Sequence, residues 1–419
     1  RFAQSMTDKL RNNALLAGTS RHNRRVALFG PYVSRNLGDT ATQMSVMQNL
    51  RRRCPDVQFL GVSPEPDDTL RSLGIPSFPL TGFGESAGNL GGEFHTSAHP
   101  DRGRAVSFRA IRKIAGFIRS LDLLVISGGG QIDDFWGGPW AHPWSMLLWT
   151  AIARWQGVPV VYLAIGLDKL DAALSRRFCV WALRMASARS FRDPQTHQAM
   201  LQLGLNKPSF VCPDVVFALE FAETRVATGS QPFVVLSPIS RKTWSSMETD
   251  THTRYLQALI EAGLHFAKQG FAIRIVCSQT VMDSADAIHI ARCLTEGGVV
   301  ELTLCDAPIV EDFLRHVSGA ELVVASRLHA VILSLITGAP VVALAHLGKV
   351  GAAMKAVTLD DFCLSLQGFH TDQLLTLIDR ALSRREILRN QIRAANLRLR
   401  SELLPTFDTL VSLLPPKST

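Results

Sequence analysis

The chain has 419 residues, 47% of them hydrophobic, and carries a formal net charge of +8 from 44 basic and 36 acidic side chains. This length suggests two domains, each large enough to bury a core. The mild basic excess fits an anionic substrate or an anionic membrane surface. Zinc-finger spacing, RNA-binding aromatic signatures and long Lys/Arg-rich stretches are all absent from the sequence, which argues against nucleic acid as a partner.

Cysteine usage and hydropathy bear on where the protein works. No apolar stretch reaches the ~20 residues that span a bilayer. No signal peptide is visible either, although the sequence starts at Arg1 rather than Met. The seven cysteines are scattered and form no C-x-x-C pair, as expected for reduced thiols, and they suggest no metal site. We therefore expect a cytoplasmic protein, and a position at the inner face of the membrane stays open.

The first half of the chain predicts a Rossmann-like domain over residues 22–224, preceded by a polar tail at 1–21. A strand should end at Gly30, and a helix should follow at 40–53. Residues 81–104, rich in Gly, Ser and His, predict a mobile loop. From Ala105 onward, short apolar runs alternate with helical patterns, which is typical of βαβ units and a parallel sheet.

The second half repeats this alternation and predicts a second Rossmann-like domain over residues 225–403. A polar break at 221–231 separates the two halves. Helices are expected to begin near Asp250, Ser284, Ile309, Leu328 and Lys349, and residues 371–403 should form one long closing helix before a tail at 404–419. The sequence therefore predicts an α/β fold with two parallel sheets.

Because open parallel sheets bind ligands beyond the carboxyl ends of their strands, the loops at these ends are the candidate sites. The first loop contains Asn36, Gly38 and Asp39 in the motif N-L-G-D. Gly38 permits a tight turn, and the following helix N-terminus suits an anion or a sugar hydroxyl. The alternative is a plain turn in which Asp39 caps the helix.

The second loop is S-G-G-G-Q-I-D-D. Its glycines, Gly128, Gly129 and Gly130, would let a ligand approach the main chain closely. Asp133, Asp134 and, further along, His142 supply the carboxylate and imidazole groups used in proton transfer. The tryptophans of this loop suit either stacking on sugar rings or core packing, and they are Trp136, Trp140 and Trp144.

Two further strand ends carry arginines. In F-R-D-P, Asp193 is expected to cap a helix that opens with Pro194, which leaves Arg192 without a local explanation. In V-V-A-S-R-L-H-A, Arg327 and His329 follow an apolar strand directly. A guanidinium can bind a carboxylate or phosphate in bidentate fashion, and a nearby imidazole can bind the anion or move a proton. The alternative partner for Arg327 is an Asp of the protein itself.

Later in the chain, Lys349 is another possible contact for an anion. Asp214, at the next strand end after Arg192, could face a ligand or form a structural ion pair.

Taken in order, these loops resemble the polysaccharide pyruvyl transferase family over Val26 to Lys349. The N-x-G-D turn, the S-G-G-G turn, the strand-end R-D and the S-R-L-H-A segment carry the resemblance, together with the segment at 277–287. The resemblance implies two Rossmann-like domains that face a cleft, as in GT-B glycosyltransferases. It also implies that Arg327 and His329 hold phosphoenolpyruvate and that Arg192 meets the same donor.

The function that this resemblance implies is transfer of a pyruvyl group from phosphoenolpyruvate to a sugar of a surface polysaccharide or its lipid-linked precursor. The product would be a cyclic ketal, and phosphate would be released. The candidate acid and base groups are His329, His142, Asp133 and Asp134, while Asp39 could also act as a base. We expect no cofactor and no divalent metal. The alternatives are a nucleotide-sugar-dependent GT-B glycosyltransferase, with Glu301 or Glu321 on the ribose, and a non-catalytic saccharide-binding protein.

Overall fold

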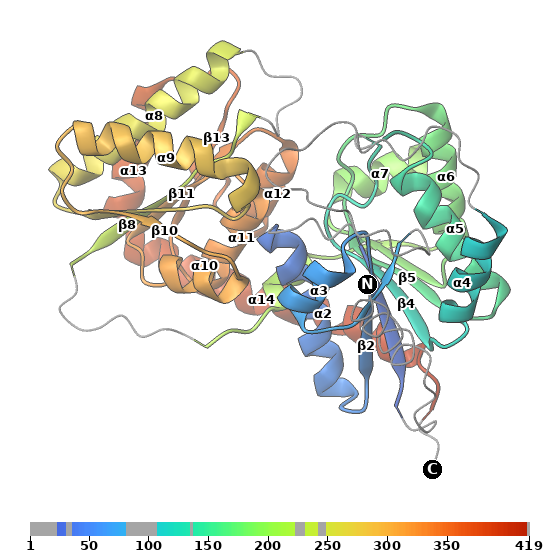
Figure 1. Cartoon of the computed structure of the whole chain (residues 1–419). Coiled ribbons are helices and arrows are strands. Elements are labelled where there is room, and N and C mark those ends of the chain that lie inside the picture. The colour runs from blue at the N-terminus through green and yellow to red at the C-terminus, as the bar shows by residue number, and fades with distance from the viewer. Residues whose placement is uncertain are drawn as a thin grey trace, which may run out of the picture. The chain divides into compact units, whose positions relative to one another are not determined.

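The computed structural model describes residues 23–30, 36–80, 107–134, 137–222, 231–241 and 249–416. The chain divides into two compact units (Figure 1). Unit 1 comprises residues 1–34, 42–215 and 403–419, and unit 2 comprises residues 35–41 and 216–402. The predicted loop at 81–104 and Trp136 lie outside the described residues.

Unit 1 contains a seven-stranded sheet in the order β3-β2-β1-β4-β5-β6-β7, and every pairing in it is parallel. Its central strands are fully buried apolar runs such as L-L-V-I-S, as expected for strands covered on both faces. The strands are Arg25–Phe29 (β1), Gln58–Ser63 (β2), Ser77–Pro79 (β3), Leu123–Ser127 (β4), Val160–Ile165 (β5), Ala188–Phe191 (β6) and Phe210–Val211 (β7).

Helices cover both faces of this sheet. Alternate strand residues such as Ala27, Phe29, Leu124 and Ile126 point to one face and share a core with α4, α5, α6 and α7. The helices are Leu37–Arg53 (α2), Pro66–Leu73 (α3), Phe108–Ile118 (α4), His142–Trp155 (α5), Ala173–Met185 (α6) and Pro194–Gln202 (α7). Figure 1 shows α4, α5 and α6 side by side next to β4 and β5.

Unit 2 contains a six-stranded parallel sheet in the order β10-β9-β8-β11-β12-β13. Its strands are Phe233–Ser237 (β8), Ala272–Val276 (β9), Leu302–Cys305 (β10), Leu322–Ala325 (β11), Val341–Ala345 (β12) and Cys363–Ser365 (β13). Its helices are Thr249–Lys268 (α8), Thr280–Glu296 (α9), Val310–Val317 (α10), Leu328–Ile336 (α11), Gly348–Ala356 (α12) and Thr371–Ser383 (α13). Helix Arg385–Ser412 (α14) belongs to unit 2 up to Glu402 and to unit 1 beyond it. The α/β class with two parallel sheets is confirmed.

Three details differ from the sequence-based expectations. Helix α2 begins at Leu37 rather than at Thr40. The expected closing helix at 371–403 is two helices, because the chain leaves the helical conformation at Arg384. Residues 404–412, expected as a tail, continue α14, and Phe407 and Leu410 are fully buried, so apolar packing extends the helix.

The two units also divide the chain differently from the predicted domains. Residues 35–41 group with the second half of the chain, and residues 403–419 group with the first. Contacts in space, rather than order in the sequence, decide which residues belong to a unit. For example, Arg53 donates a hydrogen bond to Asp408 at 2.7 Å within unit 1. None of the described helices is long and apolar enough to cross a membrane.

Candidate functional site

The N-L-G-D turn belongs to unit 2, where Asn36 rather than Asp39 caps helix α2. The Asn36 side chain accepts a hydrogen bond from the Gly38 amide at 3.1 Å and donates to Asp39 Oδ2 at 2.8 Å. The turn joins the loop after β9, because Leu37 N donates to Ser278 O at 3.0 Å and Asn36 forms a bridge with Gln279. The first motif is thereby held at the carboxyl edge of the unit 2 sheet.

His329 lies directly against this turn. A Cβ atom added to Gly38 would be 2.1 Å from His329 Nδ1, far inside van der Waals contact, so a larger residue than glycine would displace the ring. His329 itself is half-buried in the first turn of α11. Two motifs that are almost 300 residues apart in sequence therefore form one cluster within unit 2.

Arg327 forms a bidentate ion pair with Asp283 of α9. Its Nη2 donates to Asp283 Oδ1 at 2.7 Å, and its Nε donates to Oδ2. The Asp283 side chain has no solvent exposure and also accepts from the Ser240 amide at 2.8 Å. Burial raises the pKa of Asp283, and the Arg327 charge opposes that rise. The alternative left open by the sequence, an Asp of the protein as partner of Arg327, is thus realised.

Asp283 was not assigned a role from the sequence, although it lies in the family-like segment at 277–287. The pattern gave no signal for the pairing, since the two residues are 44 positions apart. Because the Asp283 carboxylate binds two of its N–H groups, the Arg327 guanidinium is held in one orientation at the strand end.

Lys349 lies in the first turn of α12 and is half-buried. This helix follows β12, the strand that pairs with β11.

The glycine turn of unit 1 follows β4. Gly128 and Gly129 both adopt φ of +59°, a conformation that favours glycine. A Cβ on Gly128 would lie 2.2 Å from Thr42 Cγ2, and one on Gly130 would lie 2.0 Å from Asp168 Oδ2. The close approach expected of a ligand is therefore made, at these two glycines, by side chains of the protein itself.

His142 opens helix α5 next to this turn. Its Nε2 is 2.9 Å from Gln131 Oε1, and its ring lies 6.1 Å from that of Phe29. Burial lowers the pKa of His142 to about 4, while the contact with Gln131 opposes the shift. The imidazole is therefore neutral at physiological pH.

The two aspartates after the glycine turn have different surroundings. Asp134 is 8% exposed and accepts hydrogen bonds from the amides of Asp171, at 3.2 Å, and Ala172, at 2.9 Å. Both of its oxygens thus hold the loop that precedes α6. Asp133 is half-buried in the same turn.

Arg192 follows β6, and its side chain is only 6% exposed. Its Nη1 is 3.6 Å from Asp214 and its Nε is 3.9 Å from Asp193, both longer than a good hydrogen bond. Among the described residues, Nε and Nη2 have no hydrogen-bond partner. Asp193 caps α7 as expected, accepting from Thr196 N at 2.6 Å. A buried guanidinium with unsatisfied donors is suited to bind an anion.

The Arg192 guanidinium packs over a glycine that the sequence analysis did not single out. A Cβ on Gly166, just after β5, would lie 2.2 Å from Arg192 Nη2. A glycine directly after an apolar strand is the sequence signal for this contact.

The predicted residues fall into two sets. Unit 2 holds Asn36, Gly38, Asp39, Arg327, His329 and Lys349, whereas unit 1 holds Gly128, Gly129, Gly130, Asp133, Asp134, His142 and Arg192. The two arginines that the resemblance assigns to one donor are therefore in different units. Among the residues described by the structure, no group of three or more His, Cys, Asp or Glu side chains could hold a metal ion.

The chain is similar to one known protein family. A family model described as "Polysaccharide pyruvyl transferase" matches residues 36–348. No match was found among curated protein sequences.

Solved structures share the fold at low sequence identity. The chain is similar to a UDP-GlcNAc 2-epimerase from Neisseria meningitidis bound to UDP-GlcNAc, with a TM-score of 0.55 and 10% identity over 93% of this chain and 99% of that one. It is also similar to a glycosyltransferase from Rickettsia africae, with a TM-score of 0.58 and 10% identity over 93% and 98%. These likenesses confirm a GT-B-like fold.

Proposed function

The chain belongs to the polysaccharide pyruvyl transferase family, and from this premise we propose that it transfers a pyruvyl group from phosphoenolpyruvate to a sugar. Family membership implies a saccharide substrate. The proposed acceptor is a sugar of a surface polysaccharide or its lipid-linked precursor, and the product is a pyruvate ketal. We place the reaction in the cytoplasm, with a lipid-linked acceptor reached at the inner face of the membrane.

One observation carries the proposal: Arg327, His329 and the N-L-G-D turn form a single cluster at the carboxyl edge of the unit 2 sheet. Phosphoenolpyruvate carries a phosphate and a carboxylate, so its site needs cations and N–H donors. Arg327 supplies a guanidinium oriented by Asp283, and it stands at the N-terminus of α11, whose dipole favours an anion. Lys349, at the start of α12, is a further cation for this donor.

The reaction balances with sugar hydroxyls as the nucleophiles. A proton adds to the methylene carbon of phosphoenolpyruvate, and a first hydroxyl oxygen bonds to C2 and loses its proton to a base. The bond from C2 to the ester oxygen then breaks, and phosphate leaves with the electron pair. A second hydroxyl bonds to C2 and closes the ketal. Of the two hydroxyl protons, one replaces the proton added to carbon and the other leaves with phosphate.

The described residues suggest roles in this series of reaction steps. His329, beside Arg327, is the proposed proton donor to the methylene carbon. In unit 1, His142 is neutral because burial lowers its pKa to about 4, and it is a proposed acceptor of the proton from the sugar hydroxyl. Asp133 is the alternative base, because both oxygens of Asp134 bind main-chain amides. Arg192 is a second proposed anion contact, with donors that its two aspartates do not saturate.

The glycosyltransferase alternative depends on a glutamate that binds a nucleotide ribose. Glu301 and Glu321 each precede a strand, β10 and β11 respectively, so both lie at the edge of the sheet opposite to the candidate site. Glu321 is also paired with Arg385 at 2.9 Å and Arg389 at 3.1 Å. The structure therefore gives neither glutamate a position suited to that role. A non-catalytic saccharide-binding protein would bind the acceptor and release no phosphate.

The test is phosphate release by the purified protein with phosphoenolpyruvate and an extract of lipid-linked saccharides. We expect acceptor-dependent phosphate release, matched by a mass gain of one pyruvyl ketal on the acceptor, and insensitive to chelator. Sugar transfer from a nucleotide sugar, lost in chelator and restored by magnesium or manganese, would support the glycosyltransferase instead. Acceptor binding with no turnover of either donor would support the non-catalytic alternative.

A further inference from the structure

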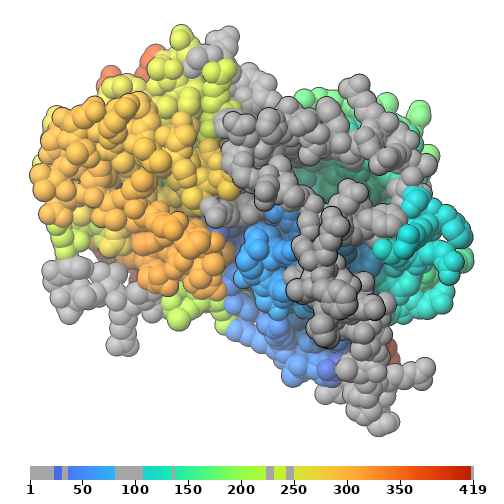
Figure 2. All heavy atoms as spheres, in the orientation of Figure 1, coloured from blue at the N-terminus to red at the C-terminus, as the bar shows by residue number. Residues whose placement is uncertain are grey.

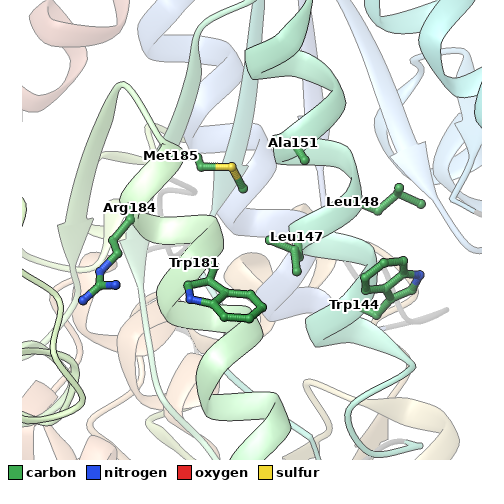
Figure 3. Close-up of a pocket in the computed structure, with 7 residues that line it drawn as sticks. All are labelled: Trp144, Leu147, Leu148, Ala151, Trp181, Arg184 and Met185. Carbon is green, nitrogen blue, oxygen red and sulfur yellow. The ribbon is translucent and has the colours of Figure 1, made fainter.

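An apolar groove lies on the outer side of α5 and α6. Its volume is about 500 Å³, and it is lined by Trp144, Leu147, Leu148, Ala151, Trp181, Arg184 and Met185. Figure 3 shows that Trp144, Leu147, Leu148 and Ala151 come from one helix, and Trp181, Arg184 and Met185 from its neighbour. Arg184 is the one charged residue of the lining, and it donates to Gly204 O at 2.5 Å.

Large aromatic side chains around this groove are exposed to solvent. Trp155 is 79% exposed, Trp140 59% and Trp181 47%, while Phe108 of the neighbouring α4 is 75% exposed. Trp140 is not loose, because its ring packs against Phe178 at 5.3 Å. Several exposed indoles on one helical layer leave apolar area in water, which is typical of a surface that binds a partner. Tryptophan in particular is favoured at the boundary between lipid and water.

The charge of the same layer is one-sided. The three helices α4, α5 and α6 contain seven basic residues and no acidic residue, and the basic residues are Arg109, Arg112, Lys113, Arg154, Arg176, Arg177 and Arg184. The formal excess of the whole chain is only +8. In the adjoining loops, Asp171 is paired with Lys169 at 3.2 Å and Asp122 accepts from Arg25 N at 2.7 Å. Figure 2 shows α4, in cyan, at the surface of the molecule.

We propose that the solvent side of α4, α5 and α6, called here the α4–α6 face, binds the surface of an anionic lipid bilayer. Arginines and lysines attract anionic headgroups, and the tryptophans and the apolar side chains of the groove contact the boundary between headgroups and acyl chains. The absence of acidic residues from these helices selects against a second copy of the chain, because two such faces brought together would repel. An anionic bilayer satisfies both the apolar and the electrostatic character of the face.

The face is continuous with one of the candidate site regions of unit 1. His142, which contacts Gln131 beside the glycine turn, and Trp144, which lines the groove, are two residues apart on the first turn of α5. Binding of this face to a bilayer would bring the glycine turn close to the lipid surface, where a lipid-linked acceptor is presented. The proposal does not depend on the reaction, since binding to lipid is measurable without either substrate.

The experiment is co-sedimentation of the full chain with vesicles of phosphatidylcholine alone and of phosphatidylcholine mixed with phosphatidylglycerol. We expect binding to the mixed vesicles at low salt, weaker binding at high salt, and little binding to phosphatidylcholine alone. The double variant Trp181→Ser/Arg177→Glu should lower the partition coefficient on mixed vesicles by at least ~10-fold. Both positions are exposed on the surface of α6, so the fold should be retained, which circular dichroism checks.

A matched control replaces an exposed arginine and an exposed apolar residue at the same helical spacing in unit 2. Arg393 and Leu397 are exposed on α14, and Leu397 is 70% exposed. Arg393→Glu/Leu397→Ser should bind mixed vesicles as the parent protein does. Absence of binding at low salt, or equal losses in the two double variants, would overturn the proposal. The proposal would also be overturned if the parent protein formed a dimer that Trp181→Ser/Arg177→Glu abolishes. It would be overturned as well if the parent protein showed no preference for anionic lipid and an acidic protein competed with the vesicles at full occupancy.

Phosphate release on a water-soluble acceptor separates this proposal from the proposed function. If Trp181→Ser/Arg177→Glu loses vesicle binding and its phosphate release is unchanged, the result would support the α4–α6 face as a membrane contact only. Release that is absent in the parent protein would count against the proposed reaction and leave the lipid result standing.

Discussion

Arg327 in unit 2 and Arg192 in unit 1 occupy equivalent positions, each just after a strand of a parallel sheet, yet their surroundings differ. Arg327 donates two hydrogen bonds to the fully buried Asp283. Arg192 is more deeply buried than Arg327, at 6% against 13% side-chain exposure, but its two aspartates stand 3.6 and 3.9 Å away. The first guanidinium is oriented by its partner, while the second has two N–H groups, Nε and Nη2, with no hydrogen-bond partner among the described residues.

A second parallel accompanies this difference. His329 lies over Gly38 and Arg192 lies over Gly166, so in each unit a candidate side chain fills the space above a glycine. The lesson is that burial alone does not tell what a strand-end arginine does. The pairing of its N–H groups distinguishes the two: Arg327 is bonded to a carboxylate, whereas Nε and Nη2 of Arg192 have no hydrogen-bond partner among the described residues.

The largest effect should come from Arg327→Ala. Removal of one partner from a buried ion pair leaves an uncompensated charge on Asp283, and we expect a loss of ~3–5 kcal/mol in the free energy of unfolding. Because burial raises the pKa of Asp283 and Arg327 opposes that rise, the carboxyl of the variant should become neutral more readily. The loss should therefore be greatest at neutral pH and shrink as pH falls, as measured by urea unfolding at several pH values.

Arg192→Ala is the comparison, and it should cost less stability than Arg327→Ala. Equal losses in the free energy of unfolding of the two variants would show that the distance from the arginine to its aspartate does not affect stability. The double variant Arg327→Ala/Asp283→Ala, which removes both charges, should recover part of the stability lost by Arg327→Ala.

The titration of His142 tests unit 1. Its ordinary pKa is 6.5, and burial lowers the pKa in the folded protein to about 4. As pH falls below 6.5 the unfolded chain binds a proton that the folded protein does not, so folding stability should decrease down to about pH 4. The decrease can reach ~3 kcal/mol. His142→Gln should remove this part of the pH dependence in urea unfolding, and an unchanged profile would contradict the burial of the ring.

His329→Gln tests unit 2 at the level of chemistry. Glutamine keeps a hydrogen-bond donor but cannot transfer a proton, so turnover should fall by ~100-fold or more. The readout is phosphate release at saturating phosphoenolpyruvate. His289→Gln on α9, in the same unit, is the control and should keep the parent rate. A near-parental rate in His329→Gln across neutral pH would shift the acid–base role to His142.

The glycines offer a smaller and finer test. Gly38→Ala would place a Cβ atom 2.1 Å from His329 Nδ1 and push the ring away. Displacement of a reacting group by about 1 Å can cost up to ~100-fold in rate, and we expect at least ~10-fold. Gly351→Ala is the matched control, because nothing lies within 4 Å of its added Cβ. Equal rates in the two variants would remove His329 from the proposed site.

The last test is the effect of Arg192→Ala on the binding of phosphoenolpyruvate. Loss of charge-assisted hydrogen bonds should weaken binding by ~1.5–3 kcal/mol, or about 10- to 100-fold. Calorimetry with the donor measures this directly. Gly166→Ala, whose Cβ would lie 2.2 Å from Arg192 Nη2, should weaken binding in the same direction. Unchanged affinity in both variants would restrict the donor to residues of unit 2.

Much of the fold could be predicted because its signals are local. Continuous apolar runs such as L-V-V-A indicated buried parallel strands, and Asp193 before Pro194 indicated a helix start, which its bond to Thr196 confirms. The ordered motifs predicted the family, and this is confirmed over residues 36–348. The candidate roles of Arg327, His329, Arg192 and Lys349 stay predictions.

The sequence by itself determined the alternation of strands and helices, the glycines that the turns require, and the charged residues at the strand ends, because each depends on a short stretch of chain. Only the tertiary structure decided that Asp283 pairs with Arg327, that Gly38 lies beneath His329, and that residues 35–41 group with unit 2. It also brought together on neighbouring helices the arginines and tryptophans of the α4–α6 face. These pairings depend on the order and packing of strands that are far apart in sequence, and no local periodicity encodes that order.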